Sequence, residues 1–179
     1  SWHESHGAVW MPAGNWRRPA HYGSIADEVR SVRTAAGIID VSTLGKIEVM
    51  GPDAGQLLDR MYVGVVSNLA TGRTRYALML DEAGTVIDDG VVSRLADGRF
   101  YITTTTGGSA VIYRELQRRV AEWQLDCTLH NVTGHFAAMN LAGPRSREVL
   151  ARCTDIGLDD SSFPYLAMRE GNVAGTAVR

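Results

Sequence analysis

The sequence predicts an α+β fold of two intertwined lobes, with mainly antiparallel sheets flanked by helices and truncated at the C-terminus. Three observations predict it. Helical and strand patterns are interleaved along the 179 residues. The central strands are joined by connections short enough for antiparallel hairpins. One unit of strand, Gly-Pro turn and helix occurs twice, beginning at residues 49–54 and 141–146. The repeat indicates two related lobes, and the hairpins favour α+β over a parallel doubly wound sheet.

The first third of the chain contains two helix patterns separated by a strand pattern. Ser24 is typical of a helix N-cap, and Gly37 is expected to close that helix. Residues 44–50 alternate as a strand. Pro52 then suits the first turn of the next helix, because the N–H that proline lacks has no partner there. Both helices have apolar positions at helical spacing, namely Ile25, Val29 and Val32 in the first and Leu57, Leu58 and Met61 in the second.

The rest of the chain continues with strands and helices in the same style. From this order we expect a first lobe of residues 1–43 and 136–179, with a second lobe, 44–135, inserted between its parts. Residues 173–179 have the pattern of a strand that is entered and then cut, so we expect a fragment of a longer protein. The individual predictions are strands at 73–80, 85–95, 99–105, 125–133 and 136–142, and helices at 109–123 and after Gly143-Pro144.

Composition excludes several classes of protein. Eighteen basic and 20 acidic side chains give a net charge of −2 with no basic run, which argues against a nucleic-acid partner. No apolar run approaches the roughly 20 residues that span a bilayer. With no secretory pattern at the start, a cytoplasmic location is expected. Cys127 and Cys153 lack metal-ligand or disulfide spacing and are interpreted as small buried hydrophobes, and no histidine pair has metal-ligand spacing, so no metal site is predicted.

Two adjacent carboxylates, Asp88 and Asp89, lie in the middle of an apolar strand. Because side chains alternate across a strand, the two must point to opposite faces. Burial of a carboxylate costs several kcal/mol unless it is paired, so at least one is expected to have a partner, which could be a ligand. The alternative is that one aspartate bonds local backbone N–H groups at a bulge marked by Gly90 while the other is solvated.

A run of hydroxyl side chains, residues 103–106, ends the third central strand before two glycines. It fits the edge of a polar ligand and a β-branched strand end equally well. The glycines at 84, 90, 107 and 108 match neither the dinucleotide fingerprint nor the phosphate loop, so no cradle for cofactor phosphates is indicated.

Five motifs taken together resemble the aminomethyltransferase family, which includes the glycine-cleavage T-protein. Within that family the chain most resembles the C-terminal folate-binding region of the heterotetrameric sarcosine oxidase alpha subunit, particularly at residues 39–48, 103–107 and 163–171. The resemblance covers nearly the whole chain. The five motifs occur in the family's order and spacing, and they lie at residues 40–46, 51–54, 72–80, 88–90 and 143–144.

The resemblance implies roles for four residues. It makes Asp88 the catalytic residue, a carboxylate that contacts the pterin of tetrahydrofolate and acts electrostatically or as a general base. It places Tyr76 in the same pocket, where the ring can pack on the pterin and the hydroxyl can orient it. Thr105 stands where the family has an asparagine and is expected to bind the cofactor, as is Tyr165. Further parts of the family's folate site would lie beyond Arg179, so the chain does not hold a complete site.

The implied function is a tetrahydrofolate-binding one-carbon transfer module within an enzyme that oxidatively demethylates sarcosine. A methylene-iminium or aminomethyl donor would yield methylenetetrahydrofolate and release the amine. The implied partners are tetrahydrofolate and the other subunits of a sarcosine-oxidase-like complex, with flavin and NAD confined to other domains or subunits. We expect the chain alone to be inactive. The alternative is a catalytically silent module of the same fold that binds folate or docks subunits.

Overall fold

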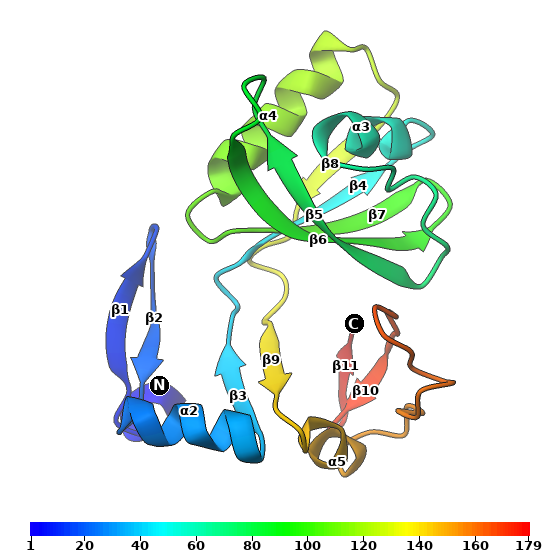
Figure 1. Ribbon diagram of the computed structural model, residues 1–179. Coiled ribbons are helices and arrows are strands. Elements are labelled where there is room, and N and C mark those ends of the chain that lie inside the picture. Colours follow the sequence, from blue (N-terminus) through cyan, green and yellow to red (C-terminus); the bar gives the residue numbers. More distant parts are fainter. The chain divides into compact units, whose positions relative to one another are not determined.

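The computed structural model describes residues 1–179, and the chain divides into two units (Figure 1). Unit 1 consists of residues 1–43, 137–164 and 169–179, and unit 2 of residues 44–136 and 165–168. The sequence-based division assigned residues 165–168 to the first lobe. They lie in unit 2 because they pair with the edge of its sheet, where Thr74 N–H donates to the Leu166 carbonyl at 2.8 Å and Met168 N–H donates to Gly72 at 2.8 Å.

Unit 2 is built on one five-stranded antiparallel sheet in the order β5-β6-β7-β4-β8. Two hairpins, β5–β6 and β6–β7, form three of its five strands, as their short connections predict. Two helices accompany the sheet. The elements are β4 (Gly45–Met50), α3 (Ala54–Met61), β5 (Arg73–Leu80), β6 (Val86–Ala96), β7 (Arg99–Thr104), α4 (Ser109–Glu122) and β8 (Thr128–Asn131).

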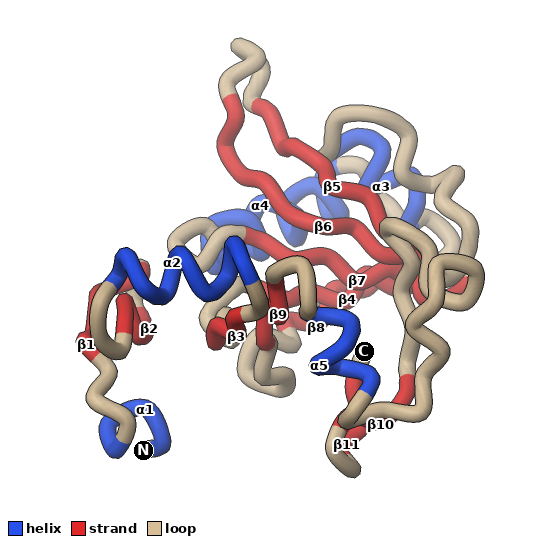
Figure 2. Tube along the Cα trace, turned by 60° about the horizontal axis from the view of Figure 1, so that its bottom comes forward, coloured by secondary structure: helices blue, strands red, loops and turns tan.

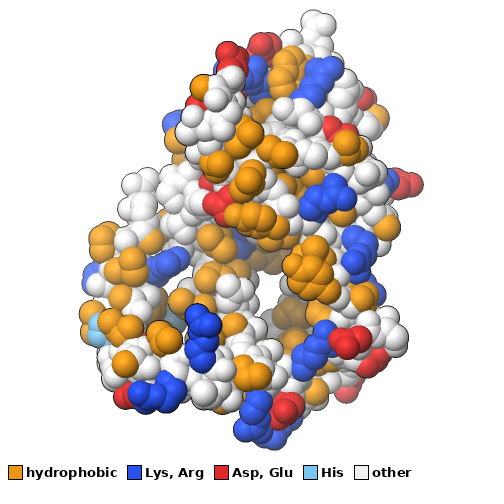
Figure 3. All heavy atoms as spheres, viewed as in Figure 1, with side chains coloured by type: hydrophobic (Ala, Val, Ile, Leu, Met, Phe, Trp, Pro, Cys, Tyr) orange, Lys and Arg blue, Asp and Glu red, His pale blue; other side chains and the backbone are white.

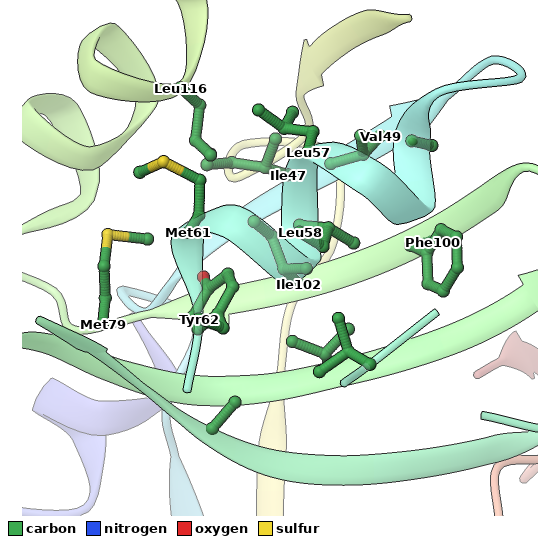
Figure 4. Packing of buried hydrophobic residues seen from close by; sticks show 14 of the residues in the cluster. Ile47, Val49, Leu57, Leu58, Met61, Tyr62, Met79, Phe100, Ile102 and Leu116 are labelled. Carbon is green, nitrogen blue, oxygen red and sulfur yellow. The ribbon is translucent and has the colours of Figure 1, made fainter. Parts of the chain in front are cut away.

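Both helices of unit 2 pack on one face of the sheet, called here the helix-covered face (Figure 2). The predicted apolar side of α3 is buried there, and Leu116 of α4 joins it (Figure 4). The other face is called the outer face. The buried core of the chain comes from this one layer of unit 2, and its largest members are Phe100, Ile47, Leu57, Leu58, Met79, Ile102 and Leu116.

Unit 1 contains three separate two-stranded antiparallel sheets, β1–β2, β3–β9 and β10–β11. Residues 173–179, expected to form a single strand, contain the turn of the β10–β11 hairpin and its second strand. The elements are α1 (Trp2–Ser5), β1 (Val9–Ala13), β2 (Trp16–His21), α2 (Ile25–Thr34), β3 (Gly37–Asp40), β9 (Met139–Ala142), α5 (Ser146–Ala151), β10 (Gly171–Val173) and β11 (Thr176–Val178).

Helix α2 shows where local prediction succeeds and fails. Ser24 caps it, with the side chain accepting from Asp27 N–H, as the sequence predicts. The prediction that Gly37 closes this helix was wrong. The helix ends at Thr34, and Gly37 is the first residue of β3. A Cβ at Gly37 would lie 2.4 Å from the Val32 side chain, so the glycine permits close approach of strand and helix. The apolar stripe of α2 is exposed.

The two cysteines differ, and the prediction that both are buried was wrong for Cys153. Cys127 is half-buried against the core of unit 2, and this burial raises the pKa of its thiol. Cys153 is exposed because it follows the short helix α5, which buries no residue.

The α+β class with antiparallel sheets is confirmed. Strands β8 and β9 are shorter than expected: β8 begins only at Thr128, a turn occupies residues 133–135, and β9 begins only at Met139. None of the helices combines the length and the hydrophobicity that crossing a membrane requires. On the face seen in Figure 3, basic side chains are interspersed with acidic and apolar ones.

Candidate functional site

Asp88 lies on the helix-covered face of β6 and is 4% exposed. Its register partner across the β5–β6 hairpin is Met79, a fully buried core residue, so both side chains face the core layer. The Asp88 carboxylate accepts the Thr105 backbone N–H at 3.2 Å. Its Oδ1 also lies 3.1 Å from the position that a Cβ on Gly108 would occupy, at the N-terminus of α4. The carboxylate therefore connects β6 to the turn that begins α4.

Asp89 lies on the outer face, as alternation along the strand requires. Its carboxylate accepts the hydroxyl of Tyr76 at 2.7 Å. Tyr76 stands on β5, opposite Val91, and is 59% exposed. The outer face thus presents an aromatic ring whose hydroxyl is held by a carboxylate, and both groups can be reached from solvent.

Of the four predicted site residues, the structure joins two to each other and a third to Asp89. It brings Asp88 together with Thr105 on one side of the sheet, and it pairs Tyr76 with Asp89 on the other. Asp88 and Tyr76, expected in one pocket, lie on opposite faces of the β5–β6 hairpin. Tyr165 is 83% exposed, and its carbonyl accepts from the Arg73 guanidinium at 2.8 Å.

Strand β6 has two irregularities, and neither lies at Gly90: the β6–β7 register shifts between Arg94 and Ala96. The β5–β6 register shifts between Met79 and Leu80, which leaves Ile87 as the additional residue. The alternative interpretation of the sequence was that one aspartate bonds local backbone N–H groups. Asp88 does accept a backbone N–H, but the donor is Thr105, 17 residues further along the chain. The other aspartate has the tyrosine as its partner.

Gly90 instead permits a close approach of β6 and β7. A Cβ there would lie 1.9 Å from the carbonyl oxygen of Thr103. The backbone pairing between the two strands ends at Val92 and Ile102. Beyond that point, hydrogen bonds between backbone N–H groups and side chains join the two segments. The Thr103 hydroxyl accepts Val91 N–H at 2.9 Å, and Asp88 accepts the N–H of Thr105.

Electrostatics reflect this arrangement. The hydrogen bond to Asp89 raises the pKa of the Tyr76 hydroxyl above its ordinary value, and partial burial and the charge of the carboxylate act in the same direction. On the helix-covered face, burial raises the pKa of Tyr62 well above its ordinary value, and the charge of Asp88 adds to this. The Tyr62 hydroxyl is buried without a hydrogen-bond partner.

Further along the outer face, Glu48 is 7% exposed and binds Arg99, with the shorter of two hydrogen bonds at 2.8 Å. Ser93 and Tyr101 are register partners on the same face. The side chains of this face are therefore largely polar, in contrast to the core layer behind them. Hydroxyl, carboxylate and guanidinium groups suit a ligand with several hydrogen-bonding edges.

No three side chains of His, Cys, Asp or Glu are grouped to hold a metal ion. Two grooves are lined by residues other than Asp88 and Asp89. One, in unit 1, is lined by apolar and polar residues of α2, β3 and the segment before α2, and the other, in unit 2, lies beside Trp123. Neither groove contains a predicted site residue.

The pairing of Tyr76 with Asp89 was missed, although the sequence contained a signal for it. The residues between the two predicted strands, 73–80 and 85–95, are 81–84, a four-residue turn. If the hairpin had no bulge, pairing the strands outward from that turn would set Tyr76 opposite Asp89. In the structure Tyr76 lies opposite Val91, two residues further along β6. A shift of two residues keeps a side chain on the same face of the sheet, so Tyr76 and Asp89 still share a face.

Comparison with known proteins finds one matching family, and the similar proteins include sarcosine oxidase alpha subunits and aminomethyltransferases. The model of the GCVT N-terminal domain matches residues 1–179. A sarcosine oxidase subunit alpha from Rhizobium meliloti (strain 1021) is 39% identical over 99% of this chain and 19% of its own length. An aminomethyltransferase from Saccharopolyspora erythraea is 34% identical over 98% of this chain and 47% of its own.

A solved structure gives the same result for the fold. The crystal structure of glycine cleavage system aminomethyltransferase T from Bartonella henselae matches with a TM-score of 0.78 at 28% identity. The match covers 93% of this chain and 44% of that one. The chain thus spans less than half of these aminomethyltransferases and about a fifth of the sarcosine oxidase subunit.

Proposed function

Because this chain belongs to the GCVT N-terminal domain family, we propose that it forms part of a tetrahydrofolate-binding unit for one-carbon transfer. The proposed reaction converts a methylene-iminium or aminomethyl donor to methylenetetrahydrofolate and releases the amine. The proposed setting is a complex like that of the sarcosine oxidase relatives, with flavin and NAD chemistry in other domains or subunits.

One observation carries the proposal: the hydrogen-bonded pair of Tyr76 and Asp89 on the outer face of β5 and β6. The exposed ring of Tyr76 can pack on a flat heterocycle such as a pterin. The Asp89 carboxylate can accept hydrogen bonds from its N–H groups. The residues present therefore fit the proposed ligand.

We assign the ligand-facing carboxylate to Asp89, whereas the family resemblance assigned it to Asp88. Tetrahydrofolate supplies the nucleophilic nitrogen that takes up the one-carbon unit. Asp89 holds the pterin edge and can accept a proton as the transfer proceeds, since its carboxylate is paired with the neutral hydroxyl of Tyr76. Asp88 is enclosed by the core layer and already bonded to Thr105. For Thr105 and Tyr165 a contact with the ligand remains a prediction.

The decisive experiment compares Asp88→Asn with Asp89→Asn in the natural protein that contains this sequence. Tetrahydrofolate binding is measured by calorimetry, and methylenetetrahydrofolate formation is measured from formaldehyde and an amine. Asp89→Asn should lower turnover about 100-fold, as for loss of a positioned acid-base group, and Asp88→Asn by much less. The control is Asp97→Asn, which removes a 96% exposed carboxylate from the same unit.

Each result has a defined meaning. A larger loss for Asp88→Asn would support the assignment from the family resemblance and overturn ours. Binding without product formation in the unmodified protein would support the silent module. Absence of binding in the unmodified protein would refute the proposed function.

A further inference from the structure

The start of helix α4 has an unusual form. Helix α4 is 14 residues long, but its N-cap is Gly108, no side chain caps it, and its first turn contains no acidic residue. The first N–H groups of a helix need acceptors, and negative charge near them is stabilising. The nearby charge is supplied from another strand, by the buried carboxylate of Asp88.

The turn before α4 is held by two hydrogen bonds in sequence. Asp88 accepts the backbone N–H of Thr105, and the Thr105 hydroxyl accepts the N–H of Gly108 at 3.1 Å. These bonds lie where the ladder between β6 and β7 has already ended. Asp88 therefore takes the place of backbone pairing in fixing this stretch of β6.

Asp89 follows Asp88 directly, so the position of one constrains the other. The peptide between them is planar, and their side chains leave the strand in opposite directions. When the Asp88 side chain is held in place, the position of Asp89 along the strand and the direction of its side chain on the outer face are fixed as well. The distance of 2.7 Å from Asp89 to the Tyr76 hydroxyl depends on that setting.

We infer that Asp88 is a positioning residue, whose carboxylate holds the turn before α4 against β6 and thereby fixes Asp89 in its pairing with Tyr76. The inference rests on the proposed function, in which Asp89 faces the ligand. It explains why two adjacent carboxylates occur in an apolar strand: one is an internal anchor and the other faces solvent and ligand.

The test uses four versions of the natural protein that contains this sequence: unmodified, Asp88→Ala, Asp88→Asn and Gly108→Ala. Asp88→Ala removes the acceptor for Thr105 N–H, whereas the amide oxygen of Asp88→Asn can retain that bond. Gly108→Ala leaves Asp88 in place but puts a methyl group 3.1 Å from its Oδ1 and 2.7 Å from the Thr105 hydroxyl. It provides the second probe if Asp88→Ala fails to fold.

The first readout needs no catalytic activity. Tetranitromethane nitrates tyrosine in its ionised form, and the hydrogen bond to Asp89 disfavours that form of Tyr76. The rate of nitration at Tyr76 is measured by peptide mass spectrometry relative to Tyr165, which is 83% exposed. Asp88→Ala and Gly108→Ala should raise this ratio about threefold or more, because a displaced Asp89 no longer disfavours the ionised form of Tyr76. Asp88→Asn should restore most of the original ratio.

The second readout is the pH profile of kcat/KM for methylenetetrahydrofolate formation. The profile depends on the group that accepts a proton in the reaction, so it should change in Asp88→Ala, where that group is displaced, and return in Asp88→Asn. Amide hydrogen exchange at residues 105–112 reports the anchor itself and should accelerate in Asp88→Ala. A merely structural role would change exchange and stability but neither the nitration ratio nor the pH profile.

Two outcomes would overturn the inference. One is faster exchange in Asp88→Ala with an unchanged nitration ratio. The other is an Asp88→Asn protein that matches Asp89→Asn in loss of product while its nitration ratio stays normal, because Asp88 would then act on the ligand directly. If the unmodified protein forms no product, the proposed function fails, while nitration and exchange still decide whether Asp88 fixes Asp89.

Discussion

The carboxylates of Asp88 and Asp89 belong to adjacent residues but lie on opposite faces of strand β6. The first accepts a backbone N–H from Thr105 at 3.2 Å, and the second accepts the Tyr76 hydroxyl at 2.7 Å. Burial distinguishes them further, since Asp88 is enclosed by the core layer and Asp89 is only partly covered. An Asp-Asp pair can therefore combine structural and ligand-directed roles within two residues.

Tyr76→Phe tests the contribution of the hydroxyl while keeping the aromatic ring. Loss of a hydrogen bond to a charged group costs about 1.5 kcal/mol, so kcat/KM for the folate-dependent reaction should fall about tenfold. Steady-state kinetics of the natural protein check this. Tyr165→Phe is the comparison, because the sequence predicts a ligand contact for that residue as well. An unaffected Tyr76→Phe enzyme would remove the hydroxyl from the proposed site.

Gly90→Ala should destabilise unit 2 by about 3 kcal/mol or more, because its Cβ would lie 1.9 Å from the backbone oxygen of Thr103. Chemical denaturation followed by tryptophan fluorescence measures the loss. Gly134→Ala is the matched control, since no atom lies within 4 Å of its added Cβ. Equal stability of the two variants would show that β6 and β7 do not approach as closely as described.

Tyr62→Phe should leave stability unchanged or raise it by about 1 kcal/mol, because the hydroxyl that it removes is buried without a partner. Tyr113→Phe is the control, since that hydroxyl donates to the Leu129 carbonyl at 3.1 Å, and its loss should cost about 1 kcal/mol. Thermal unfolding of both variants is the measurement. A large loss for Tyr62→Phe would mean that its hydroxyl has an acceptor, such as a buried water.

Stability should depend on Glu115 in acid. Hydrogen bonds from Arg118 and Arg119 lower the pKa of this carboxyl to about 2 against the opposing effect of burial. A carboxyl whose pKa is lowered by folding stabilises the protein above its unfolded pKa of 4.5, and this stabilisation disappears as the pH falls toward 2. Urea denaturation between pH 5 and pH 2 should give a shallower decline for Glu115→Gln. Identical slopes for the two proteins would contradict the pairing.

Much of the fold could be predicted because its signals are local. The three central strands and α4 were placed within two residues, since alternation and helical periodicity depend on near neighbours. The end of α2 was not predicted, because Gly37 serves a strand packed on Val32 rather than a helix cap. Cys153 was misplaced because burial depends on what surrounds α5, which its own sequence does not encode.

The candidate site was predicted only in part. Alternation required that Asp88 and Asp89 face opposite sides, and the structure has them so. Which side carries the helices depends on the packing of α3 and α4, elements about 30 residues before and 20 residues after the pair. That long-range arrangement decides which aspartate is enclosed, and no local pattern reveals it.

The short segment 165–168 also affects the order in which the chain can fold. It bonds to the edge strand β5 across 92 residues, from Thr74 to Leu166. At about 5 to 20 residues per second, a ribosome adds those residues over roughly 5 to 20 s. During that interval the β5 edge has no partner at this end, and an unpaired edge favours association with other chains. The β5 edge of unit 2 is therefore covered at this end only after most of unit 1 has been synthesised, which links the maturation of the two units in time.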